Sequence, residues 1–101
     1  MNQQAMMRQL QQMQAEMAKA QAELAETEVT GQSGNGLVEV VCTATGEWRA
    51  LRIDPKLIDP EDPDMLQDLI LAALNDAKAI AERTQQERLG PLTAGLSLPG
   101  F

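Results

Sequence analysis

The feature that most constrains the fold is a heptad repeat of apolar residues near the start of the chain. Between residues 6 and 24 they recur at alternating spacings of four and three, which is typical of a helix packed lengthwise against another helix. A stripe this narrow gives only a marginal helix in isolation, so the helix needs a partner. The sequence therefore predicts a coiled-coil-like helix over residues 5–27. Its candidate core or dimer seam is formed by Met6, Leu10, Met13, Met17 and Leu24.

A second helix is predicted over residues 63–89. Asp62 suits the N-cap position and Pro63 the first helical position, where its missing N–H costs nothing. The first half of this segment carries a wide apolar face and the second half is polar, so we expect the second half to project from the core. Gly90 and Pro91 are expected to end the helix. Residues 90–101, rich in Gly, Pro, Ser and Leu, are expected to form a flexible tail.

Between the helices, residues 28–53 have the pattern of a three-strand meander. Residues 37–43 are rich in β-branched side chains, residues 48–53 alternate, and residues 28–30 add a third short strand. Gly31, Gly34 and Gly36 are interpreted as a turn. A phosphate-binding loop is the alternative for this glycine-rich segment, but neither the Lys-Ser/Thr pair nor a helix follows it.

The residue types exclude most catalytic and metal-binding arrangements. The chain has no histidine and one cysteine, Cys42, which rules out the usual zinc clusters, histidine-based triads and an internal disulfide. The acidic turn at residues 59–64 lacks the ligand spacing and glycine of a calcium loop. We therefore expect no metal, no cofactor and no enzymatic activity. The sequence also lacks a membrane-length apolar run and a signal-peptide pattern, which favours a soluble cytoplasmic protein.

Several local motifs are similar to those of one known family. The motifs are Glu28-Val29-Thr30-Gly31, Ser33-Gly34-Asn35-Gly36-Leu37-Val38, Ile53-Asp54-Pro55, Asp68-Leu69, Ala72-Ala73, Asn75-Asp76-Ala77, Gly95-Leu96 and Leu98-Pro99-Gly100-Phe101. Together they resemble the YbaB/EbfC family of bacterial nucleoid-associated proteins, over essentially the whole chain. The resemblance implies an α+β fold, with an α–β–β–β–α protomer, a small antiparallel sheet and two long helices. It also implies an intertwined, tweezer-like homodimer.

The same resemblance implies a function. It is that of a nucleoid protein that binds double-stranded DNA with little sequence preference, helps to organise the nucleoid and regulates gene expression. Proteins of the recombination or clamp-loading machinery are expected as further partners. The candidate DNA-binding residues are the cations of the two predicted helices, which a two-fold dimer would present twice: Arg8, Lys19, Lys78, Arg83 and Arg88.

The charge of the chain keeps a second hypothesis open. The net charge is −7, and four of the carboxylates lie in the turn at residues 59–64. Members of the family commonly carry several lysines in the first helix, whereas here Arg8 and Lys19 are outnumbered by glutamates. The i,i+4 spacing also allows Lys78 to pair with Glu82, and Arg83 with Glu87. The alternative function is an acidic protein-interaction module that works with recombination or replication proteins and binds DNA weakly or not at all.

Overall fold

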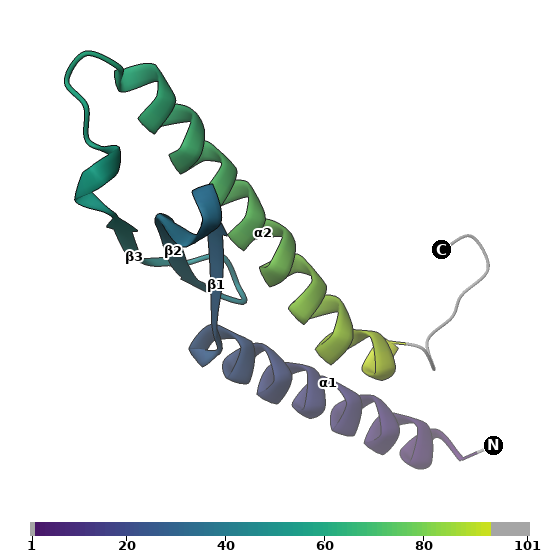
Figure 1. The fold of residues 1–101 in the computed structure, drawn as a ribbon. Coiled ribbons are helices and arrows are strands. Elements are labelled where there is room, and N and C mark those ends of the chain that lie inside the picture. The colour runs from purple at the N-terminus through teal and green to yellow at the C-terminus, as the bar shows by residue number, and fades with distance from the viewer. Residues whose placement is uncertain (1, 94–101) are drawn as a thin grey trace.

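The computed structural model describes residues 2–93 and has the predicted order of elements, α–β–β–β–α. Two short 3-10 turns, η1 and η2, follow β1 and β3. This confirms the expected α+β protomer with a small antiparallel sheet and two long helices (Figure 1). The bounds are α1 Gln3–Glu26, β1 Glu28–Ser33, η1 Gly34–Gly36, β2 Val38–Thr43, β3 Trp48–Ile53, η2 Pro55–Leu57 and α2 Pro63–Thr93.

The core lies between one face of the sheet and α2. The strand order is β1-β2-β3, both pairings are antiparallel, and a register shift interrupts the second pairing at Val41 and Cys42. Alternate residues of β1 and β2 point toward α2, which presents three alanines at intervals of one turn. Small side chains let the helix approach the sheet closely. The buried core residues are Val29, Val38, Val40, Cys42, Ala73, Ala77 and Ala81.

The assignment of Gly31 to a turn was wrong. Gly31 lies inside β1, opposite Val40 of β2, and positive φ angles begin only at Gly34, Asn35 and Gly36. A Cβ atom at Gly31 would clash with the backbone amide nitrogen of Ala77. Gly31 is therefore needed for the close approach of a helix to a strand, whereas the following residues form the expected left-handed turn.

The two helices form an arm that extends away from the sheet. In Figure 1, α1 runs back beneath the second half of α2, so the start of α1 and the end of α2 lie at the same end of the molecule. Ala20 and Leu24 are buried near the sheet, and Met13 and Met17 are half-buried further out. Part of the heptad seam is thus covered within a single chain, by the chain's own second helix.

Helix α2 begins as predicted but ends later. The Asp62 carboxylate accepts a hydrogen bond from the Met65 amide at 3.2 Å, which is the expected N-cap. The helix then continues through Gly90 and Pro91 to Thr93, so the predicted end at Leu89 was wrong. Proline removes one backbone donor from the helix. Pro91 and Leu92 line a hollow together with Met13 of α1.

The expected flexible tail can be compared with the structure only in part. Residues 90–93 belong to α2, and residues 94–101 lie outside the described part of the chain. Within residues 2–93, no helix is both long enough and apolar enough to cross a membrane.

Candidate nucleic-acid interface

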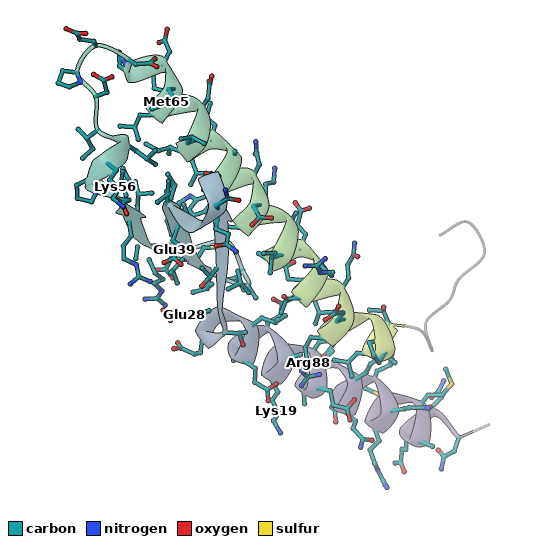
Figure 2. All side chains as sticks on the ribbon, in the orientation of Figure 1. Lys19, Glu28, Glu39, Lys56, Met65 and Arg88 are labelled. Atoms are coloured by element: carbon teal, nitrogen blue, oxygen red, sulfur yellow. The ribbon has the colours of Figure 1, made fainter. Side chains whose placement is uncertain are left out.

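Arg8 and Lys19 share one face of α1. They are eleven residues apart, which places them within about 20° of each other around the helix and about 16 Å apart along it. The covered seam residues Met13, Met17 and Leu24 lie on the opposite side of α1. Figure 2 shows Lys19 projecting away from α2, and both cations are exposed. The outer face of α1 therefore carries two cations, spaced by three helical turns, and the exposed Glu26 lies on the same face, eighteen residues from Arg8.

Arg88, the last of the predicted DNA-binding residues, has a different environment. It lies on the side of α2 that faces α1, where its Nε and Nη2 atoms both donate to Oε2 of Glu23, at 3.1 and 2.8 Å. Figure 2 places it between the two helices. The Arg88 guanidinium therefore links α2 to α1, and the Glu23 carboxylate balances its charge.

Lys78 and Arg83 do not join the same face. They are separated by about 140° around α2, so one flat surface cannot collect both. Both are exposed, and neither of the i,i+4 pairs allowed by their spacing, with Glu82 and Glu87, is among the ion pairs of residues 2–93. Lys78 borders a hollow beside β3. The structure therefore brings together only two of the five predicted DNA-binding residues.

The remaining cations lie near carboxylates. Arg52 pairs with Glu39 across β2 and β3 at 3.0 Å, and Arg49 with Glu47 along the chain at 3.6 Å. Lys56 lies in η2, within the segment of residues 54–68, which carries six carboxylates and one lysine. This segment therefore accounts for −5 of the net charge of −7. We call residues 54–68 the acidic end.

The acidic end and the start of α1 are far apart in this elongated molecule. Its principal dimensions are 70 × 28 × 16 Å, and Figure 1 shows the loop before α2 at the opposite end from the start of α1. Fields from exposed charges fall off over about 8 Å at physiological ionic strength. The charge of the acidic end is consequently separated from Arg8 and screened from it, whereas Glu16, Glu23 and Glu26 lie on α1 itself.

A second surface feature, which the sequence did not reveal, is an uncovered apolar strip on β3. The pairings Leu51–Val40 and Trp48–Cys42 place Leu51 and Trp48 on the α2 side of the sheet, because directly opposed residues share a face. Helix α2 covers β1 and β2 but leaves these two side chains 49% and 54% exposed. Next to Trp48 lies a hollow of about 410 Å³ between α2 and the β2–β3 turn. The alternating pattern of residues 48–53 predicted a strand correctly. It did not predict that α2 would leave this strand uncovered.

Two observations concern metal binding and thiol reactivity. Within residues 2–93 no group of three or more His, Cys, Asp or Glu side chains is placed to hold a metal ion. Cys42 is a buried strand residue, and burial raises the pKa of its thiol above the ordinary value of 9.0. The thiol is consequently held in its unreactive protonated form.

Comparison with known proteins identifies the family of this chain. The profile of the YbaB/EbfC DNA-binding family matches residues 1–96. The chain belongs to this family. A nucleoid-associated protein of Nocardia farcinica is 55% identical over 98 residues, covering 97% of this chain and 89% of the relative. One of Streptomyces griseus is 54% identical over 104 residues, covering 99% and 91%.

A solved structure also has the same fold. The crystal structure of an uncharacterized protein from Helicobacter pylori superposes with a TM-score of 0.78 at 27% sequence identity. The match covers 91% of this chain and 97% of the other. Membership of the family of nucleoid-associated DNA-binding proteins is thus supported by sequence and by fold.

Proposed function

We propose that this member of the YbaB/EbfC family binds duplex DNA as a homodimer, with little sequence preference, through phosphate contacts from the outer face of α1. The observation that carries the proposal is the alignment of Arg8 and Lys19 on one exposed helix face. Lys and Arg contacts to phosphates supply affinity without sequence information. A nucleoid location in the cytoplasm and a role in organising DNA and regulating genes follow from such binding.

We expect little DNA sequence preference because the exposed face of α1 lacks the side chains that read bases. The exposed face of α1 is rich in Gln and carries no aromatic side chain for base stacking. Sequence readout requires donors and acceptors fixed against base edges, whereas two long cations on a solvated face position the protein on the backbone. The binding is therefore electrostatic in origin and depends strongly on salt.

The proposed dimer interface is the apolar strip of β3, with a second copy of this chain as its occupant. An edge strand with exposed apolar side chains is a site for pairing with another chain. Trp48 and Leu51 lie on this strand, and its α2 side is uncovered. Burial of this strip by a second copy would enlarge a core that is small in the single chain. Two protomers would present four outward cations from Arg8 and Lys19, as in the expected tweezer-like arrangement.

A salt titration of DNA binding tests the phosphate contacts. Four cations per dimer predict a slope of log K against log salt near about −3.6 on B-DNA. Lys19→Gln removes two of the four and should reduce the slope to about −1.8. The matched control is Lys56→Gln, which removes the same charge at the acidic end and should leave the slope unchanged. Equal effects of the two variants would contradict a binding site on α1.

Light scattering tests the dimer separately. The chain mass is 11.0 kDa, so we expect twice that mass in solution and a monomer after Leu51→Lys. Leu71→Lys is the matched control, because Leu71 is similarly exposed but lies on α2 away from the core. A monomeric Leu71→Lys variant beside a dimeric Leu51→Lys variant would place the interface on α2 instead.

The acidic end favours a second candidate function, a protein-interaction module that works with recombination or replication proteins. Six carboxylates and the exposed side chain of Ile58 lie together there. A surface of this kind suits a basic partner with an apolar contact point. A dimer that binds no DNA even at low salt, but is retained by a purified clamp-loader or recombination protein, would support this function over the first.

A further inference from the structure

Strand β3 contains one residue more than the part of β2 that it faces. The register of the two strands shifts by one between Ala50 and Trp48, so Arg49 has no opposed residue and forms a β-bulge. In a regular strand, residues three apart point to opposite faces of the sheet. Because of the extra residue, Trp48 and Leu51 both lie on the α2 side, where each is about half-exposed.

The same bulge brings two opposite charges together on the other face of β3. Arg52 lies opposite Glu39 on the outer face, away from α2. The Glu47 carbonyl accepts a hydrogen bond from the Thr43 amide at 2.8 Å, so the ladder extends to Glu47 and alternation places its side chain on the outer face too. The side chains of Arg52 and Glu47 are 73% and 66% exposed. Each forms one ion pair within the chain and remains open to a second partner.

Strand β3 also forms a free edge of the sheet. Among residues 2–93, β2 is the only strand that pairs with it (Figure 1). An edge strand presents N–H and C=O groups that can bind the backbone of another strand. At the other edge, Val29 and Gly31 of β1 are buried beneath α2. Of the two edges, β3 is therefore the one that exposes apolar side chains on the α2 side.

We propose that β3 pairs antiparallel with β3 of a second copy, with Trp48 of each copy opposite Leu51 of the other. Two three-stranded sheets then become one sheet of six strands. This register rests on the β3 dimer interface proposed above and specifies its geometry. It also sets Glu47 of each copy opposite Arg52 of the other. Aromatic side chains opposite aliphatic ones, and opposite charges directly across a sheet, both stabilise strand pairing.

The bulge at Arg49 is what permits this register. A two-fold axis perpendicular to the sheet keeps the same face of both copies on the same side, so opposed residues must share a face. Residues three or five apart in a regular strand do not share one, and such a strand could not pair in this way. With the bulge, both pairs match, and two residues separate Trp48 from Leu51 in each copy. A shift of one residue would set Trp48 opposite Arg52, which lies on the other face.

Disulfide trapping tests the register. In a Cys42→Ala background, Glu47→Cys with Arg52→Cys should give a disulfide-linked dimer under mild oxidation. Opposed residues of antiparallel strands have Cα atoms about 4.5–5.5 Å apart, and a disulfide requires less than about 7 Å. Within one chain the two positions are separated by about 16 Å of strand, so an intrachain disulfide does not compete. The matched controls are the two single-cysteine variants, which should be trapped at least tenfold more slowly, because each cysteine lies about 16 Å from its copy.

Light scattering on the reduced proteins separates the register from the dimer itself. A dimeric mass without trapping of the double variant would overturn the register and leave the dimer. Trapping of either single variant as fast as the pair would do the same. A single-chain mass for the Cys42→Ala protein would overturn the dimer and the register together.

Charge reversal gives a second readout that requires no cysteine. Arg52→Glu should weaken dimerisation at least fivefold, because two pairs of opposite charges become two pairs of like charges. Adding Glu47→Arg should restore the dimer affinity to within threefold of the wild type. Glu47 and Arg52 of one chain are too far apart to compensate each other, so restoration requires contact between copies. An unchanged dimer in Arg52→Glu, or no restoration in the double variant, would overturn the register.

Discussion

Gly31 of β1 lies directly against the backbone of Ala77 in α2. A methyl group at Gly31 would stand 2.6 Å from the Ala77 Cα atom and 2.7 Å from the carbonyl oxygen of Ala73. No side chain separates β1 from α2 at this point. Gly31 therefore determines how closely α2 approaches the sheet and where along β1 it crosses. Two hydrogen bonds hold the same crossing: the Gln32 amide donates to the Asp76 carboxylate, and the Ser33 hydroxyl donates to the Leu69 carbonyl.

Gly31→Ala should therefore destabilise the protein severely. The nearest atoms are backbone, which cannot move aside without shifting α2, so we expect the variant to lose about 3 kcal/mol or more of unfolding free energy. Chemical denaturation at fixed protein concentration measures the loss.

Gly90→Ala is the matched control for that variant. Gly90 is helical, and a Cβ atom there meets nothing within 4 Å. Alanine favours a helix over glycine by up to about 1 kcal/mol, so this substitution should be neutral or stabilising. A loss as small in Gly31→Ala as in Gly90→Ala would show that α2 does not pack directly on β1.

The ion pair between Glu23 and Arg88 predicts a coupling between the two helices of the arm. Both side chains are partly exposed, which limits the coupling energy to about 1 kcal/mol or less. A double-mutant cycle with Glu23→Gln and Arg88→Met should give a positive coupling that shrinks with added salt. If Arg88 served DNA instead, Arg88→Met would reduce the salt slope of binding as much as Lys19→Gln does.

The sequence was sufficient to predict the elements because each has a local signal. The heptad spacing, the N-cap at Asp62 and the alternation of residues 48–53 all produced the predicted structure. The assignment of Gly31 to a turn failed because a glycine in a sequence is an ambiguous signal. Glycine serves equally for a turn and for close approach of backbone, and only the position of α2, a non-local fact, distinguishes the two.

The candidate site was predicted less well for a related reason. A sequence shows which residues are cations, but it does not show which side chains lie next to each cation in the fold. Arg88 and Glu23 are 65 residues apart and meet only because α1 folds back beneath α2. The alignment of Arg8 with Lys19, by contrast, follows from helical periodicity alone and was within reach of the sequence. The bare strip on β3 depends on which strands α2 covers, which no local pattern encodes.

Burial of Cys42 predicts a pH-dependent loss of stability on the alkaline side. Because burial raises the thiol pKa in the folded state, ionisation favours the unfolded chain. The free energy of unfolding should be unaffected by this group below its ordinary pKa and fall above it, by at most about 1.4 kcal/mol per pH unit. Cys42→Ala should lack this component. Rapid reaction of the native protein with a thiol reagent at pH 7 would contradict the burial.

The distance between the acidic end and the arm predicts how neutralising carboxylates affects DNA binding. Glu61→Gln with Asp64→Asn removes two exposed charges without touching the N-cap at Asp62. At about 0.01 M salt the screening length is near 30 Å, so the variant should bind DNA more tightly than the wild type. At about 0.15 M it is near 8 Å, and the two affinities should agree within about twofold. A large gain that persists at the higher salt concentration would mean that DNA approaches the acidic end, and would remove the argument for a site confined to the outer face of α1.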